Sequence, residues 1–146
     1  MPTTLGDEFL PTWRGKYPAM LPEDHPIWDK FLDKNASLFD RIYYNVRVGG
    51  IYPPEEYGDE KMRKSFYEVT AKRIDALCEL KNELWIVEVA SRPGLRATGQ
   101  LLTYLALWLD DIRIQKPVKM VLVANSIDED LRRALQINGV LVRLVI

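Results

Sequence analysis

The chain has 146 residues, of which 47% are hydrophobic and 28% are charged, a length and composition typical of one domain with a single hydrophobic core. The formal net charge of −1 excludes a general attraction to nucleic acid, so any DNA contact would come from a local basic patch. The single cysteine excludes a disulfide framework, no apolar run is long enough to cross a bilayer, and we expect no signal peptide because the first residues are acidic and contain proline.

The first 26 residues differ from the rest because they hold five of the nine prolines, with Trp13 and Tyr17 among them. Proline fixes φ and removes a hydrogen-bond donor, so we predict an extended arm over residues 1–26 and a folded domain over residues 27–146. Proline-rich segments lose little conformational entropy when they dock. We therefore expect the arm to bind a neighbouring subunit, with packing against its own domain as the alternative.

The next predicted elements are a helix, a strand and a second, short helix. Apolar residues at near-helical spacing predict a helix over residues 27–39, with an interruption near Asn35. Arg41–Val48 alternates in polarity and is rich in tyrosine and valine, which predicts a strand that ends at two glycines. A loop with two adjacent prolines follows over residues 51–60, and a short helix is expected over Glu60–Tyr67.

Two strands joined by a tight connection follow, over Lys72–Leu80 and Leu84–Ser91. Successive side chains of a strand point to opposite faces of the sheet. On the first strand this alternation places Asp75 on one face and both Ile74 and Ala76 on the other. On the second strand one face carries Ile86, Glu88, Ala90 and Arg92.

The last third of the chain predicts alternating helices and strands. A long apolar helix is expected over Leu95–Asp111, and the continuous apolar run Val118–Ala124 is typical of a covered central strand. A last helix over Asp128–Asn138 begins at a capping box that Ser126 opens, and a strand over Val140–Ile146 closes the chain. This order of elements predicts an α/β fold, with a mixed central β-sheet flanked by helices on both faces.

Asp75 and Glu88 form the candidate site because they lie thirteen residues apart on the two arms of the predicted hairpin. Adjacent antiparallel strands place side chains of one face side by side, so the two carboxylates can converge on one divalent cation. Hard cations such as Mg²⁺ prefer oxygen ligands, and a cation held there activates water and neutralises charge on a phosphate. Gln100 and Tyr104 lie one helical turn apart and face the same way.

Three segments carry a family resemblance: Arg73–Ala76, Trp85–Ala90 and Gly99–Tyr104. Together they resemble the PD-(D/E)XK nuclease superfamily, and especially its RecB-like members, which have a Q-x-x-x-Y motif on the helix after the metal-binding strand. They also resemble small proteins of this type encoded by tailed bacteriophages. The resemblance covers residues 41–146 and implies a restriction-endonuclease-like core, αβββαβ plus αβ, behind the extended N-terminal arm.

The resemblance also implies roles for individual residues. Asp75 and Glu88 would bind Mg²⁺ or Mn²⁺, and the carbonyl of Val89 would face the same metal. Gln100 and Tyr104 would line the DNA-facing side of the site.

Ala90 departs from the family pattern, because a lysine that positions the attacking water belongs two residues after the glutamate. A methyl group can neither donate a proton nor stabilise an oxyanion, and the loss of one such group typically costs on the order of 10²–10⁴ in rate. Arg92, one pleat further along the strand, and Arg96, on the following helix, could supply positive charge instead. Arginine stays protonated, so it replaces lysine poorly where a proton must move.

The missing lysine favours a nuclease fold that has lost its activity. We therefore expect a structural or assembly component of a phage virion, in the head, neck or tail, held by its N-terminal arm to other subunits of a homo- or hetero-oligomer. Its location would then be the virion or the host cytoplasm, with no membrane partner. One alternative is an active Mg²⁺- or Mn²⁺-dependent DNA nuclease in which Arg92 or Arg96 replaces the lysine, and another is an inactive protein that binds DNA ends or junctions.

Overall fold

A single mixed β-sheet forms the centre of the fold. The computed structural model describes residues 3–145, and within them six strands follow one another across the sheet in chain order. The strands are β1 (Glu8–Phe9), β2 (Arg41–Val48), β3 (Lys72–Glu79), β4 (Leu84–Ala90), β5 (Val118–Ala124) and β6 (Val140–Leu144). The first three neighbouring pairs are antiparallel, and the β4–β5 and β5–β6 pairs are parallel.

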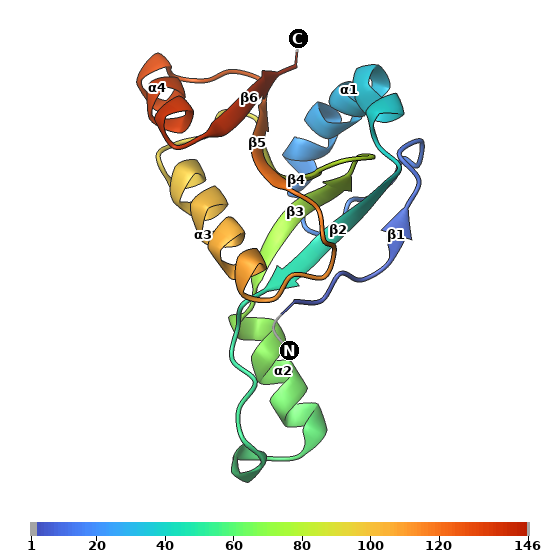
Figure 1. Cartoon of the computed structure of the whole chain (residues 1–146), viewed down its shortest axis with the longest axis vertical. Coiled ribbons are helices and arrows are strands. Elements are labelled where there is room, and N and C mark those ends of the chain that lie inside the picture. The colour runs from blue at the N-terminus through green and yellow to red at the C-terminus, as the bar shows by residue number, and fades with distance from the viewer. Residues whose placement is uncertain (1–2, 146) are drawn as a thin grey trace.

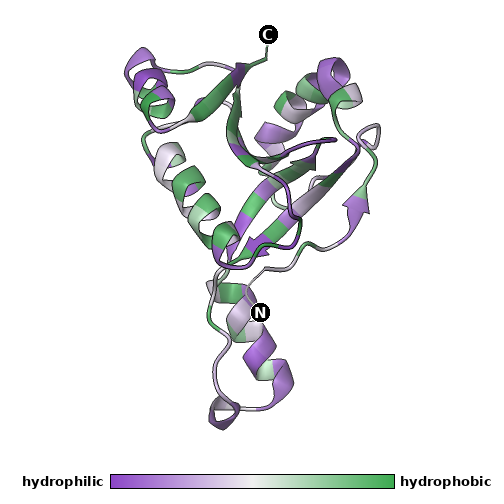
Figure 2. Cartoon of the chain, in the orientation of Figure 1, coloured by the Kyte–Doolittle hydropathy of each residue, from purple (hydrophilic) through white to green (hydrophobic). Residues whose placement is uncertain are grey.

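Helices cover both faces of this sheet (Figure 1). They are α1 (His25–Asn35), α2 (Glu60–Thr70), α3 (Arg96–Asp110) and α4 (Glu129–Ile137), with short 3₁₀ turns η1 (Pro22–Asp24), η2 (Ala36–Leu38) and η3 (Glu55–Tyr57). α1 buries Trp28 and Leu32 against one face, whereas α3 and α4 bury Trp108 and Leu135 against the other. Figure 2 shows hydrophobic residues concentrated on the strands and along α3. The predicted α/β architecture, a mixed sheet with helices on both faces, is confirmed.

Among the helices described, α2 alone does not lie on the sheet, and it projects beyond the end of the sheet (Figure 1). It runs three residues further than the sequence predicts, to Thr70. Within residues 3–145, no helix combines the length and the apolar character that a membrane crossing needs.

The start of α4 differs from the predicted capping box. The Asp128 side chain caps the helix, because its carboxylate accepts a hydrogen bond from the Asp130 backbone N–H at 2.8 Å. Ser126 lies before the cap, and its backbone N–H donates to the Ser91 carbonyl at 3.2 Å. The prediction that Ser126 opens the helix is therefore wrong, since its backbone is held at the end of β4.

The N-terminal arm packs on its own domain. Phe9 pairs with β2 as part of β1, and the rings of Phe9, Trp13 and Tyr17 lie 5.2, 5.9 and 5.0 Å from the ring of Tyr44. Tyr17 is 1% exposed. For these aromatic residues the structure bears out the alternative, packing against the arm's own domain, because they lie against the α1 side of the sheet.

In β2 and β3, the alternation of side chains between the two faces of the sheet is interrupted at the same level. Asn45 has a φ of +56°, and this left-handed conformation interrupts the regular alternation of β2. Ile74 on β3 therefore packs in the cluster beneath α3 and α4, while Ala76 packs in the cluster beneath α1. The expectation that Ile74 and Ala76 share a face is wrong. Asp75 lies between them, at the point of the change.

Candidate metal and nucleic-acid site

β3 and β4 separate where the candidate site lies. Their pairing ends at Ala76 and Val87, although β3 remains paired with β2 as far as Lys72 and β4 remains paired with β5 as far as Ala90. Asp75 and Glu88 are the next residues beyond that last pair, so they stand at the opening of the fork. The local sequence favours this arrangement because the short connection of the hairpin determines which residues oppose each other.

The Asp75 side chain provides the hydrogen-bond acceptor for a backbone N–H of β4 that no longer pairs with the β3 backbone. Its side chain is 9% exposed, and its carboxylate accepts a hydrogen bond from the Val89 backbone N–H at 2.9 Å. The N–H and C=O of a strand residue point to the same side, so the Val89 carbonyl also points toward the side that β3 has left. This bond fixes the Asp75 carboxylate beside β4.

The pKa values of Asp75 and Glu88 are both raised in the buried site that they share. Burial first, and then the charge of Asp75 and a hydrogen bond to it, raise the pKa of Glu88 to about 9. Burial also raises the pKa of Asp75 to about 7, against the opposing effect of the Val89 N–H. Two adjacent carboxyl groups in a buried site cannot both be ionised at little cost. Glu88 has the higher pKa of the two, because Asp75 already accepts the Val89 hydrogen bond.

Asp24 is a third acidic residue at the site, and the sequence patterns did not indicate it. It is the last residue of η1, is 8% exposed, and accepts a hydrogen bond from the Ser91 backbone N–H at 3.2 Å. Its charge raises the pKa of both Asp75 and Glu88. The signal available was its place directly before α1, where aspartate usually caps a helix, yet its side chain makes no capping bond to α1.

Tyr104 approaches the two carboxylates from α3. Its side chain is 7% exposed, and burial first, then the charges of Glu88 and Asp75, raise the pKa of its hydroxyl. Gln100 lies one turn earlier on α3 and is partly exposed. The structure thus brings together Asp75, Glu88 and Tyr104, with Gln100 on the adjoining turn.

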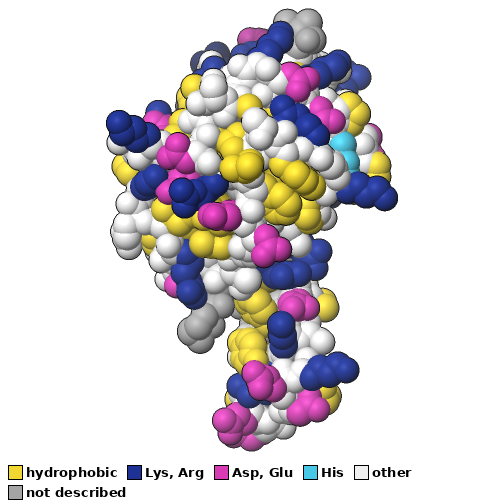
Figure 3. Space-filling model, turned by 90° about the vertical axis from the view of Figure 1, so that its right-hand side faces the viewer, with side chains coloured by type: hydrophobic (Ala, Val, Ile, Leu, Met, Phe, Trp, Pro, Cys, Tyr) yellow, Lys and Arg dark blue, Asp and Glu magenta, His cyan; other side chains and the backbone are white. Residues whose placement is uncertain are grey.

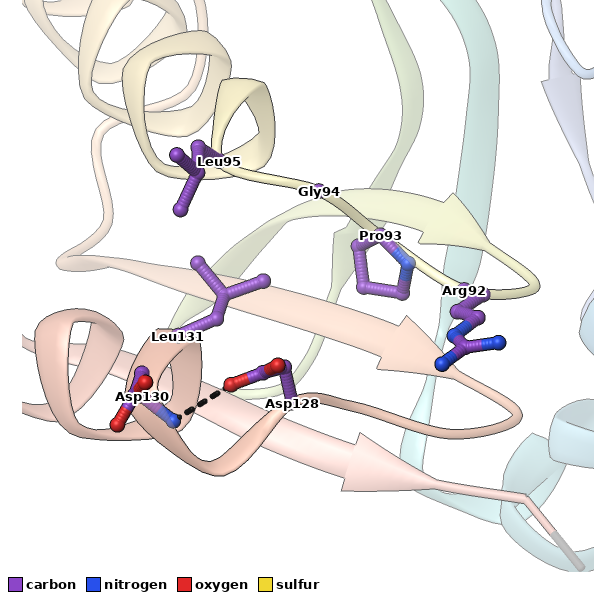
Figure 4. Close-up of a pocket in the computed structure, with 7 residues that line it drawn as sticks. All are labelled: Arg92, Pro93, Gly94, Leu95, Asp128, Asp130 and Leu131. Carbon is purple, nitrogen blue, oxygen red and sulfur yellow. Dashed lines mark hydrogen bonds between the residues drawn. The ribbon is translucent and has the colours of Figure 1, made fainter.

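Arg92 and Arg96 lie apart from the two carboxylates. Both are exposed, and Arg92 lines a hollow between the β4–α3 connection and the start of α4, together with Leu95, Asp128 and Leu131 (Figure 4). The neighbouring charges that shift the pKa of Glu88 are those of acidic residues, Asp75 and Asp24. Ala90 ends β4 and is partly buried.

The donor atoms at the fork fit a hard divalent cation. One carboxylate oxygen of Glu88, Oε1, is buried without a hydrogen-bond partner, and an unpaired buried polar atom is costly unless a ligand satisfies it. Carboxylate and carbonyl oxygens are the ligands that Mg²⁺ and Mn²⁺ favour. Across residues 3–145 no three His, Cys, Asp or Glu side chains cluster closely enough to hold a metal, so the matching set is Asp75, Glu88 and a backbone carbonyl.

Comparison with known proteins gives one family. The family model described as the Endonuclease NucS C-terminal domain matches residues 56–145, which include α2 and the chain from β3 to β6. No curated protein and no solved structure matches. The matched region contains Asp75, Glu88, Gln100 and Tyr104 and leaves out Asp24.

The family match overturns the expected role in a virion. It relates the chain to the nuclease domain of an endonuclease and not to a phage structural protein. The prediction of a structural or assembly component of a virion, held by its arm, is therefore wrong, and so is the virion location that followed from it. The prediction rested on the missing lysine at Ala90, but the loss of one catalytic group does not by itself identify another function.

Proposed function

Because the chain belongs to the family of the Endonuclease NucS C-terminal domain, a PD-(D/E)XK nuclease domain with a restriction-endonuclease-like fold, we propose that it is a Mg²⁺- or Mn²⁺-dependent deoxyribonuclease. The reaction is hydrolysis of a phosphodiester bond in DNA. The observation that carries this proposal is the meeting of Asp75 and Glu88 at the β3–β4 fork, where Glu88 Oε1 is buried and unpartnered.

Asp75, Glu88 and the Val89 carbonyl would hold the metal. When bound, such an ion activates water and neutralises the charge that builds on a phosphate. Asp75 enters this set already oriented by the Val89 N–H. Glu88, whose pKa is raised to about 9, has to release its proton, so metal and proton compete for one carboxylate.

Tyr104 and Gln100 would line the side of the site that receives DNA. A hydroxyl with a raised pKa stays protonated at neutral pH, so Tyr104 acts as a hydrogen-bond donor or acceptor and not as a base. Gln100, one turn away, offers both an amide donor and an acceptor. The two side chains suit the positioning of a phosphodiester beside the carboxylates.

Arg92 or Arg96 would supply the positive charge that Ala90 does not. Both guanidinium groups are exposed, and arginine binds phosphate through paired hydrogen bonds. We infer that they contact the phosphate of the substrate and leave the protonation of Glu88 unchanged. Without a lysine, the rate should be lower by on the order of 10²–10⁴ than in a complete site.

Cleavage assays test this function. The purified chain is incubated with single- and double-stranded DNA and Mn²⁺, beside Glu88→Ala, Ala90→Lys and the exposed-site control Glu56→Ala. We expect slow cleavage that Glu88→Ala abolishes, that Glu56→Ala leaves unchanged and that Ala90→Lys raises. Cleavage that persists in Glu88→Ala would point to a contaminating nuclease and refute the assigned site.

A binding assay separates a nuclease from an inactive DNA binder. If the wild type cleaves nothing but shifts DNA in a gel at low ionic strength, with an affinity that falls as salt rises, the chain is a DNA-binding relative without activity. Cleavage that appears only in Ala90→Lys would support the same conclusion.

A further inference from the structure

The ladder between β2 and β3 is interrupted at one level of the sheet. The regular pairs on either side of the interruption are Tyr44 with Ala76 and Val46 with Ile74. Between these pairs, Asn45 on β2 and Asp75 on β3 lie opposite each other without a register pairing. Within residues 3–145, Asn45 is the one residue other than glycine that has a positive φ, at +56°.

This interruption lies in the interior of the domain. Asn45 is partly buried and Asp75 is buried. On the surface, by contrast, acidic and basic side chains are mixed over the face shown in Figure 3, and charges of mixed sign do not select one charged ligand. The irregular backbone, and not a surface charge pattern, therefore indicates where the fold departs from regular structure for a function.

The left-handed conformation of Asn45 is unfavourable in itself. A side chain makes this region costly for every residue except glycine, although asparagine tolerates it better than most. The Asn45 side chain does not offset the cost through its carbonyl oxygen, because Oδ1 is buried without a hydrogen-bond partner among the described residues. Strain of this kind persists where the surrounding structure holds it, and it is concentrated at functional sites.

The interruption reverses the faces of the side chains beside it. Residues two apart on a regular strand share a face. On β2, however, Tyr44 packs in the cluster beneath α1 and Val46 packs in the cluster beneath α3 and α4. On β3 the same difference separates Ala76 from Ile74. Asp75 lies at the reversal, so the alternation assigns its side chain to neither face.

The Asp75 carboxylate lies in the plane of the sheet. The N–H groups of a strand lie in that plane, whereas the side chains of a regular strand stand roughly perpendicular to it. The Val89 N–H points from β4 toward the side that β3 has left, and the Asp75 carboxylate accepts its hydrogen bond there at 2.9 Å. A carboxylate perpendicular to the sheet would not reach this N–H.

We propose that Asn45 is a positioning residue for the candidate metal site, because its left-handed backbone turns the Asp75 carboxylate into the plane of the sheet and into the β3–β4 fork. A regular ladder at this level would restore the alternation of β3 and carry the carboxylate out of the fork. The consequence for metal binding and cleavage rests on the proposed function. The orientation of Asp75 itself does not, since it is present in the metal-free protein.

Glycine and valine at position 45 separate the role of the backbone from that of the side chain. Glycine adopts a positive φ freely and lacks the Oδ1 atom, whereas valine is an outlier in this region. Asn45→Gly should therefore keep the fork and Asn45→Val should disturb it. Gly139 gives a matched control, because it has a φ of +77° in the turn between α4 and β6, where an added Cβ meets nothing within 4 Å. Gly139→Val thus imposes the same backbone strain beside an edge strand away from the fork.

Amide hydrogen exchange of the metal-free protein, measured by NMR, tests the orientation of Asp75. Relative to the amides of β5, the Val89 amide should exchange roughly tenfold faster in Asn45→Val, as the cost of a left-handed side chain implies. Asn45→Gly and Gly139→Val should leave this ratio unchanged. Circular dichroism verifies that each variant is folded, and Asn45→Ala replaces Asn45→Val if valine prevents folding.

The affinity for Mn²⁺ gives the second measurement, by titration calorimetry. It should fall roughly tenfold in Asn45→Val, because only molecules with Asp75 in the fork bind the ion, and it should be retained in Asn45→Gly and in Gly139→Val. If the wild type neither binds Mn²⁺ nor cleaves DNA, the proposed function fails, whereas the exchange of the Val89 amide still decides the role of Asn45.

Two results would overturn the positioning role. Exchange of the Val89 amide that is as slow in the folded valine or alanine variant as in the wild type would mean that β3 orients Asp75 without Asn45. Exchange that is as fast in Asn45→Gly as in Asn45→Val would mean that the Asn45 side chain, and not its backbone conformation, holds the fork.

Discussion

The raised pKa values of Asp75 and Glu88 link the candidate site to the stability of the fold. The folded, metal-free protein keeps the protons of these carboxyl groups until pH values near 7 and 9, whereas the unfolded chain releases them near pH 3.8 and 4.5. Between these limits the folded state binds more protons than the unfolded state. The free energy of unfolding therefore falls as pH rises.

We expect the metal-free protein to lose several kcal/mol of stability between pH 5 and pH 9 through this pair. Urea unfolding in the presence of a chelator, at intervals of one pH unit, measures the loss. Glu88→Gln keeps a neutral side chain of the same shape and should flatten the profile above pH 7, where the contribution of Asp75 is already lost. An equally steep profile for Glu88→Gln would show that the pH dependence arises elsewhere.

Asp24 contributes charge to the site and a hydrogen bond to the Ser91 backbone. Asp24→Asn keeps an acceptor for Ser91 but removes the charge, so we expect the affinity for Mn²⁺ to fall by about tenfold. Titration calorimetry measures it, with the exposed-site variant Asp7→Asn as the control. Unchanged affinity in Asp24→Asn would mean that Asp24 only anchors the connection after β4.

At the scale of elements, the N-terminal arm acts as part of the hydrophobic core. Tyr17 packs against Tyr44, and its hydroxyl donates a hydrogen bond to Asp29 on α1. The arm therefore closes the α1 face of the sheet, a position that proline and aromatic content alone did not predict.

Tyr17→Ala should lower the free energy of unfolding by about 3–5 kcal/mol, as large-to-small substitutions of buried aromatic residues do. Tyr17→Phe removes only the hydroxyl and should cost about 1 kcal/mol. Chemical unfolding measures both values, and sedimentation should show that neither variant changes the state of association. A change in association without a loss of stability would return the arm to a role in partner binding.

At the scale of the whole molecule, metal binding should couple to folding. A cation that binds the folded fork and not the unfolded chain stabilises the protein by about 2.7 kcal/mol when its concentration is a hundredfold above the dissociation constant. Thermal unfolding with and without Mn²⁺ should show this shift, and Glu88→Ala should lack it. The shift should grow from pH 6 to pH 9, since the metal then no longer competes with a proton.

The sequence by itself determined the order and type of the elements. Local periodicity is sufficient for β2 and β5, whose observed bounds equal the predicted ones. It also placed Asp75 and Glu88 on the two arms of one hairpin, because a short connection keeps consecutive antiparallel strands adjacent. The same local pattern carried the family resemblance, and the family match confirms its coarser statement, a PD-(D/E)XK nuclease domain.

Only the tertiary structure decided which distant residues meet. Asp24 reaches Ser91 across 67 positions of sequence, the arm returns to Tyr44, and the irregular φ of Asn45 turns Ile74 to the other face. None of these has a periodic signal, because each depends on how separate elements pack and not on how neighbouring residues alternate. Burial, which raises the pKa of the Asp75–Glu88 pair, likewise arises only when helices close over both faces of the sheet.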